Sequence, residues 1–110
     1  MAYDHFGLYQ RILFHLEATP RITLTALSRE LVVDRHTLER ALHVHAGGSF
    51  KEVQSSVLFQ KAQKLLITKP NWSIKEVAFH LGYGSRRSFE RLIRSRCDLS
   101  PAEFRKRVSQ

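Results

Sequence analysis

The side chains best suited to chemistry in this sequence are arginines that recur at matching positions in two stretches of the chain. Arg35 and Arg40 are answered by Arg86 and Arg91, each pair being 51 residues apart. The planar fork of arginine can donate two hydrogen bonds to guanine O6 and N7, and it also pairs with phosphate. The repeated arginines therefore point to a nucleic acid as the partner.

A glutamate recurs within the same two basic stretches, as Glu39 and Glu90. A glutamate can accept a hydrogen bond from cytosine N4, so both residues are candidates for contact with a base. The alternative is an ion pair within one helix, such as Glu90 with Arg86 or Arg94, which contributes only about 0.2–0.5 kcal/mol. The sequence leaves both roles open.

The overall charge agrees with an anionic partner. The 110 residues include 18 Lys and Arg against 10 Asp and Glu, a formal net charge of +8. Such a bias favours phosphate-rich ligands or anionic membranes. No apolar run approaches the roughly 18 residues that span a bilayer, and the N-terminus does not resemble a secretory signal. We therefore expect a soluble, cytoplasmic protein. Composition alone does not separate phosphate-rich ligands from anionic membranes, and the expectation of no membrane partner rests on the repeat described below.

Catalytic and metal-binding chemistry have little support in the sequence. Cys97 is the only cysteine, which excludes an internal disulfide and a thiolate metal cluster. His43 and His45 would point to different faces of a helix, and no carboxylate cluster joins them. We expect Cys97 to be structural, and we expect no enzyme activity, no cofactor and no metal site.

Three helices are expected in the first half of the chain, where they would position the first arginines. Apolar residues at four-residue spacing indicate an amphipathic first helix, which Pro20 ends. Thr23 and Asp34 are good N-caps for two more, since their side-chain oxygens accept backbone N–H groups at a helix start. The expected ranges are 5–18, 24–31 and 35–46.

A long helix is expected in the middle of the chain. Gly47 and Gly48 end the third helix, after which Ser49 and Glu52 form a capping box. The apolar pattern continues to about Thr68, where a Lys-Pro-Asn sequence breaks it. At about 1.5 Å per residue, this helix would span on the order of 27 Å.

Three further helices are expected after this break. Their N-caps are serines, two of which form capping boxes with a glutamate three residues later. Gly82 suits the end of the first helix, and Pro101 suits the first turn of the last. The N-caps are Ser73, Ser85 and Ser100. Seven helices result, with no credible strand, so the fold class is all-α.

Residues 73–104 read as a second copy of residues 23–53, with one extra residue in the second turn. The shared positions are caps and apolar anchors, so the repeat is one of fold. Each copy has the layout of a homeodomain-like helix-turn-helix unit, whose second helix enters the major groove of DNA. We expect a first subdomain over 1–48, a linker helix over 49–68 and a second subdomain over 69–110.

The helical period predicts which side chains of the two reading helices face outward. The helix that starts at Arg35 would present Arg35, His36, Glu39, Arg40 and His43. The helix that starts at Arg86 would present Arg86, Arg87, Glu90, Arg91 and Arg94. Backbone N–H groups at helix starts, and cations beside them, offer further sites for phosphate. The phosphate candidates are Thr23, Ser73, Lys75, Arg94 and Arg105. Capping or simple exposure to solvent is the alternative role for these residues.

The second copy resembles the signature of the AraC/XylS family. The matching residues run from Ser73-Ile74-Lys75-Glu76-Val77-Ala78 through Gly82-Tyr83, Ser85, Phe89 and Arg91 to Ser100-Pro101-Ala102-Glu103-Phe104-Arg105. The pattern of Ala62 and Leu65-Leu66 looks like the linker helix of that family. The resemblance covers about residues 8 to 108, the whole DNA-binding domain of that family.

The resemblance implies a bacterial transcription regulator whose two subdomains enter successive major-groove segments of one duplex. Carried over by position, the base-reading residues would be Arg35, His36, Glu39 and Arg40 in the first unit and Arg86, Arg87, Ser88 and Arg91 in the second. Many members activate transcription by touching RNA polymerase, and most carry an effector-binding or dimerisation domain. We therefore expect an activator that contacts RNA polymerase, and we slightly favour a C-terminal fragment, without its sensor or dimerisation domain, over a stand-alone regulator.

Three residues depart from the family pattern. Val32 stands in the first turn where the family often has glycine, and a β-branched residue resists positive φ, which predicts a strained or rearranged turn. Asp98 stands where glycine is usual, although aspartate tolerates the left-handed region better than most residues. Leu58 occupies a linker position that is often arginine in the family.

A basic module that binds proteins or membranes without reading a DNA sequence is the alternative function. A basic amphipathic helix suffices for such a role. It needs neither a repeated turn nor a matched pair of reading helices. The repeat therefore favours DNA.

Overall fold

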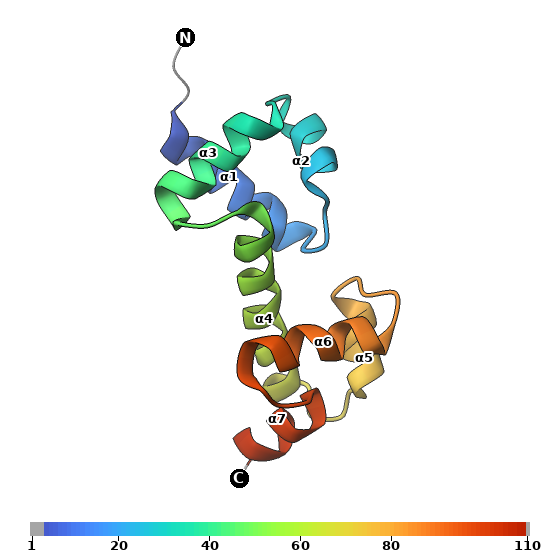
Figure 1. Ribbon diagram of the computed structural model, residues 1–110. Helices are drawn as coiled ribbons and strands as arrows, with labels where there is room; N and C mark the ends of the chain where they lie inside the picture. The colour runs from blue at the N-terminus through green and yellow to red at the C-terminus, as the bar shows by residue number, and fades with distance from the viewer. Residues whose placement is uncertain (1–3, 110) are drawn as a thin grey trace. The chain divides into compact units, whose positions relative to one another are not determined.

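The computed structural model describes residues 4–109, and within that range the chain folds into α-helices without a strand (Figure 1). The seven helices are α1 (His5–Ala18), α2 (Leu24–Leu31), α3 (Arg35–Ala46), α4 (Phe50–Thr68), α5 (Ile74–His80), α6 (Arg86–Cys97) and α7 (Pro101–Val108). This order confirms the all-α prediction, and α2 to α7 begin directly after the residues predicted to cap them.

The helices form two compact units, which divide the chain between Val57 and Leu58, inside α4. Val53 and Val57 in the first half of α4 pack against the first core. Leu58, Ala62 and Leu66 in the second half belong to the second core. The helix expected as a linker therefore also supplies apolar side chains to both units.

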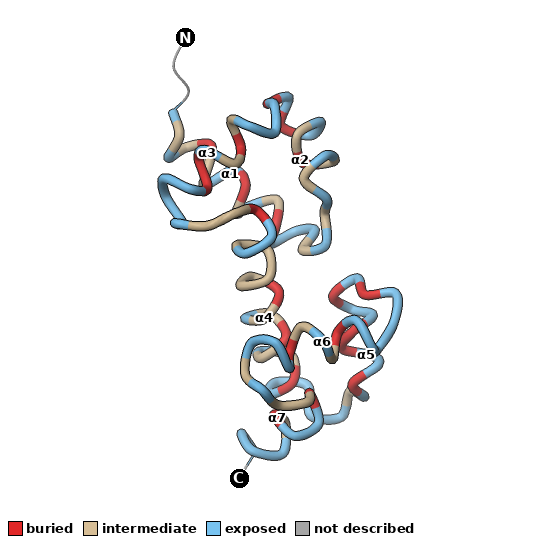
Figure 2. The backbone as a smooth tube through the Cα atoms, in the orientation of Figure 1, coloured by how far each residue is buried: buried red, intermediate tan, exposed pale blue. Residues whose placement is uncertain are grey.

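The core of the first unit fixes the inner face of α3. Ile12 and Leu16 of α1, Leu27 of α2, and Leu38 and Leu42 of α3 have no exposed surface. Buried positions are drawn in red along the backbone in Figure 2. Burying a side chain of this size contributes roughly 1.5–3 kcal/mol. Because α1 packs chiefly against α3, the opposite face of α3 is left open to solvent.

The core of the second unit fixes α6 in the same way. Phe89 and Ile93 of α6 have no exposed surface, and neither has Val77 of α5 or Ala62 of α4. The ring of Tyr83, from the turn before α6, lies 5.6 Å from the ring of Phe89, centroid to centroid. The second helix of each helix-turn-helix unit is thus anchored by its apolar face.

Side-chain caps fix the helix starts. All three predicted capping boxes form, each with two hydrogen bonds of 2.9–3.2 Å between the serine and glutamate residues. The pairs are Ser49 with Glu52, Ser73 with Glu76, and Ser100 with Glu103. Asp4 caps α1 by accepting the N–H of Gly7 at 3.1 Å, a cap that the sequence analysis did not identify. A cap of this kind contributes about 1 kcal/mol.

The turns of the two helix-turn-helix units have matching geometry. The N–H groups of Val33 and Tyr83 each donate to the carbonyl five residues earlier, at 3.1 and 3.0 Å. The preceding residues, Val32 and Gly82, have positive φ angles of 54° and 97°. Glycine adopts this conformation freely, whereas valine is strained in it. The turn at Val32 therefore keeps its shape and carries the expected strain. Asp98 also adopts a positive φ, of 60°.

Arg105 of α7 holds the segment that joins α4 to α5. Its Nε, Nη1 and Nη2 atoms donate to the carbonyls of Leu66, Trp72 and Lys69, at 3.1, 2.6 and 3.2 Å. The end of a helix leaves carbonyls without partners inside the helix, and a guanidinium can satisfy several of them. The guanidinium of Arg105, a phosphate candidate from the sequence, thus donates to carbonyls of the second unit.

We predict that Val32→Gly stabilises the first unit. The left-handed conformation costs a residue with a Cβ about 1–2 kcal/mol, and glycine removes this cost. Glycine also raises the entropy of the unfolded chain, which offsets roughly 0.4–1 kcal/mol of the gain. The Val32 side chain is 85% exposed, so little packing is lost. Urea denaturation followed by circular dichroism should show a gain of about 0.5–1 kcal/mol in the free energy of unfolding. Val32→Ala, which keeps the Cβ, should gain less. A destabilised Val32→Gly would show that the turn is not strained.

Arg105→Ala should destabilise the second unit, because three carbonyls lose their donor. The expected loss in the free energy of unfolding is about 1–3 kcal/mol. Trp72 is the only tryptophan, so its fluorescence during urea denaturation reports on this unit. Lys106→Ala removes a neighbouring exposed charge and should change stability by less than about 0.5 kcal/mol. Equal effects of the two variants would contradict the structural role of Arg105.

Candidate nucleic-acid interface

The solvent face of α3 is basic. Arg35, His36 and Arg40 are exposed, whereas Leu38 and Leu42 on the opposite face are buried. Cations that start in the first turn of a helix with a fixed inner face can reach a ligand without moving the backbone. The structure therefore places these three predicted residues on one accessible surface.

Glu39 differs from its neighbours on α3, because its carboxylate is used within the first unit. Its side chain is half-buried, and its Oε2 accepts the backbone N–H of Phe50 at 3.2 Å. Phe50 is the first residue of α4, so its N–H has no partner within the helix. A carboxylate is also favoured at this positive end of the helix dipole. The structure thus gives Glu39, a predicted base-reading residue, a capping role.

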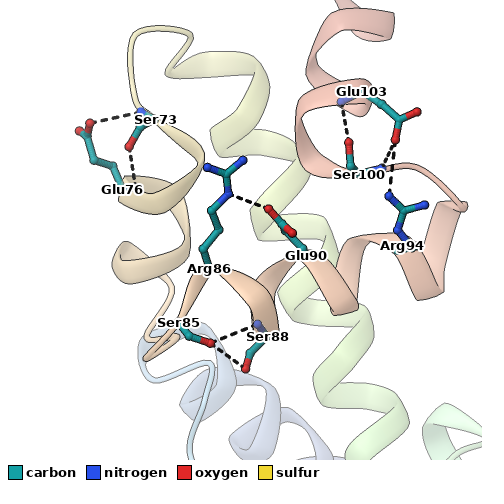
Figure 3. A network of polar contacts seen from close by, with 9 residues as sticks. All are labelled: Ser73, Glu76, Ser85, Arg86, Ser88, Glu90, Arg94, Ser100 and Glu103. Atoms are coloured by element: carbon teal, nitrogen blue, oxygen red, sulfur yellow. Dashed lines mark hydrogen bonds and ion pairs between the residues drawn. The ribbon is translucent and has the colours of Figure 1, made fainter.

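The solvent face of α6 carries more arginines than that of α3. Arg86, Arg87, Ser88 and Arg91 are all exposed. The N–H of Ser88 donates to the hydroxyl oxygen of the N-cap Ser85 at 3.2 Å, and the two hydroxyl oxygens lie 3.1 Å apart (Figure 3). The predicted reading residues of the second unit therefore lie together in the first two turns of one helix.

Two carboxylates contact arginines of this face (Figure 3). Glu90 Oε1 lies 2.6 Å from Arg86 Nε, so of the two roles that the sequence leaves open for Glu90 the structure shows the ion pair within one helix. Arg94, the other partner considered for Glu90, instead has its Nη2 3.6 Å from Oε1 of Glu103 on α7. The arginines of α6 are therefore held differently, Arg86 from within its own helix and Arg94 from the next.

The two reading helices begin with caps of different charge. Asp34 caps α3, and hydrogen bonds from the Thr37 hydroxyl at 2.8 Å and the Thr37 N–H at 3.1 Å hold the pKa of its carboxyl below the usual range. Asp34 is therefore ionised at neutral pH. Ser85, which caps α6, is neutral. The start of α6 consequently attracts an anion more strongly than the start of α3.

The predicted phosphate contacts are not equally available. Thr23 and Ser73 use their hydroxyl oxygens to accept backbone N–H groups of their own helices, at 3.1 and 3.0 Å. Arg105 is engaged with backbone carbonyls. Lys75 and Arg94 are exposed and keep cationic groups at the surface. These two side chains are the phosphate candidates that the structure leaves most accessible.

Other chemistry has no visible site in the described part of the chain. Within residues 4–109, no three side chains of histidine, cysteine, aspartate or glutamate gather as metal ligands would. In the same range, no helix combines the length and apolar character needed to cross a bilayer. The half-buried Cys97 contacts the Ile93 carbonyl through its sulfur, at 3.3 Å. This contact agrees with a structural cysteine at the end of α6.

Comparisons with solved structures place this fold among DNA-binding domains. A transcriptional regulator from Chromobacterium violaceum with an AraC-type DNA-binding domain is 20% identical over 94% of each chain, with a TM-score of 0.81. The DNA-binding domain of AdpA, a global transcriptional factor solved in complex with a target DNA, is 24% identical over 90% of this chain and 89% of that one, with a TM-score of 0.80. CdpR, a transcriptional regulator from Pseudomonas aeruginosa, is 29% identical over 90% of this chain and 31% of its own, with a TM-score of 0.74.

Sequence comparison leads to the same family. No curated protein matches the chain. A family model described as a helix-turn-helix domain matches residues 27–107, which include both turns and both basic helices. This match confirms the family resemblance over most of the range in which the sequence suggests it, and it includes both copies. The chain belongs to the AraC-type family of helix-turn-helix domains.

Proposed function

We propose that this domain binds double-stranded DNA and regulates bacterial transcription, with α3 and α6 as its reading helices. The observation that carries the proposal is a pair of capped helices, each with its inner face fixed in a core and with arginines on its outer face. A helix needs such firmly placed donors in order to read base edges in the major groove. The AdpA domain, solved with a target DNA, shares this fold.

The proposed base-reading residues lie on the outer faces of these two helices. They begin in the first turn of each helix, the part that meets base edges in helix-turn-helix complexes. They are Arg35, His36 and Arg40 of α3 and Arg86, Arg87, Ser88 and Arg91 of α6. Glu39 is left out, because its carboxylate caps α4.

Phosphate contacts would position the two reading helices on the duplex. The side chains of Lys75 and Arg94 are the proposed donors, together with backbone N–H groups at the helix starts capped by Thr23 and Ser73. Such contacts fix the register of a protein on DNA without reading its sequence. Two reading helices in one chain then allow a monomer to bind two blocks of bases about one helical turn apart, roughly 34 Å.

We further propose that the domain activates transcription in the cytoplasm through contact with RNA polymerase, as the resemblance to the AraC/XylS family implies. CdpR extends well beyond the region that this chain matches. We propose a similar arrangement, in which a sensor or dimerisation domain accompanies the DNA-binding domain. A promoter-reporter strain expressing the domain with and without a fused dimerising segment would test whether DNA binding is sufficient for activation.

Binding to duplex DNA should weaken steeply as salt increases. Each phosphate contact releases counterions, so four such contacts would lower the affinity about 100-fold between 50 and 200 mM salt. Filter binding at these two concentrations measures the effect. Binding that ignores salt, or that favours anionic vesicles over DNA, would instead support the alternative of a basic protein- or membrane-binding module.

Arg91→Ala and Arg40→Ala should each lower affinity for the preferred duplex more than for random DNA. The preferred duplex is first selected from a random library, and the expected specific loss is about 1–3 kcal/mol per arginine. Arg11→Ala removes the same charge from the exposed surface of α1 and should weaken both duplexes equally and slightly. Equal losses on both duplexes for Arg91→Ala would make that residue a phosphate contact instead of a base reader.

A further inference from the structure

Glu39 and Glu90 occupy corresponding positions in the two reading helices but have different partners. Glu39 accepts the N–H of Phe50, which is eleven residues further along the chain and starts α4. Glu90 accepts the Nε–H of Arg86 within α6, at 2.6 Å (Figure 3). Of two glutamates at corresponding positions, Glu39 therefore caps a helix, whereas Glu90 lies beside an arginine on the exposed face of α6.

The difference follows from the residue that starts the next helix. Position 101, eleven residues after Glu90, corresponds to Phe50 and is a proline that starts α7. A proline nitrogen carries no hydrogen, so Pro101 has no N–H to donate to a carboxylate. The neighbouring N–H groups of Ser100 and Glu103 are already taken by the capping box. The start of α7 thus lacks the donor that retains Glu39 in the first unit.

Released from capping, Glu90 holds the guanidinium of Arg86 by one edge. The Arg86 side chain is 56% exposed, and the carboxylate occupies only its Nε–H. The four N–H groups on the two terminal nitrogens remain, in the planar fork that matches the O6 and N7 acceptors of guanine. Fixing this fork before DNA arrives reduces the side-chain entropy that binding would otherwise remove. In the first unit, the Glu39 carboxylate is directed to α4 instead of Arg35.

We infer that Glu90 is a positioning residue for DNA recognition: it presents the terminal fork of Arg86 to a guanine, and Pro101 makes it available for this role. The inference rests on the proposed function. It assigns different roles to two glutamates that the repeat alone would treat as equivalent. The ligand class is a base pair with two acceptors in the major groove of duplex DNA.

Equilibrium binding to the selected duplex, and to duplexes with single base-pair changes, tests the role of Glu90. Glu90→Ala should reduce the preference for guanine at one position by about tenfold. In an Arg86→Ala background, the same substitution should have no further effect, because Glu90 acts through Arg86. Glu39→Ala is the matched control, and it should lower the Tm while leaving every base preference unchanged.

NMR of the free protein tests the ion pair without DNA. In the wild-type chain the Arg86 Nε–H should exchange slowly with solvent, and in Glu90→Ala it should exchange as fast as that of Arg35. Pro101→Ala restores an N–H at the start of α7 and should shift Glu90 away from Arg86, with the same two consequences. Because Pro101 is buried, the Glu90 variants carry the test if Pro101→Ala does not fold.

The outcomes separate this inference from the proposed function. Wild-type binding with a clear base preference that survives Glu90→Ala unchanged would overturn the role of Glu90 and leave the DNA reading intact. An additive loss in the double variant would also overturn it, since Glu90 would then act independently of Arg86. Absence of any base preference in the wild-type chain would overturn the proposed function together with the inference.

Discussion

Each unit of this domain depends on one half of α4 to complete its core. A unit of about fifty residues is near the lower limit at which a hydrophobic core is stable on its own, so each needs every apolar face available to it. Val53 and Val57 close the first core, and Leu58, Ala62 and Leu66 complete the second. The firm placement of α3 and α6, and with it the position of every proposed DNA contact, follows from this packing.

The two units keep their shared scaffold by different local means. The left-handed turn that joins the helices is formed by Gly82 in one unit and by a strained Val32 in the other. The cap of the reading helix is a neutral Ser85 in one unit and a charged Asp34 in the other. These differences alter strain and charge around the reading helices while their backbones remain alike. The two units therefore share their backbone geometry and differ in the electrostatics of the exposed faces of α3 and α6.

The sequence predicts this fold well because its signals are local. Capping boxes, glycines at helix ends and the apolar period act over three or four residues, and every predicted start of α2 to α7 agrees with the structure. The intramolecular partners of Glu39 and Arg105 do not follow from such local signals, because they lie 11 and up to 39 residues away. Charge and helical period do not reveal such distant acceptors or donors. Pro101 is the one local signal of the difference between Glu39 and Glu90, because a proline at a helix start also removes an N–H donor.

Pro101 also affects how the exposed residues of α3 and α6 in this chain can be compared. A rule that assigns base contacts from residue positions along α3 and α6 would treat Glu39 and Glu90 alike. Glu39, however, caps α4, whereas Glu90 pairs with Arg86. The distinction comes from the backbone of Pro101, a buried residue eleven positions after Glu90 that has no N–H to donate. Transplanting α6 without α7 would therefore transfer the exposed side chains of α6 without the proline that leaves Glu90 free to pair with Arg86.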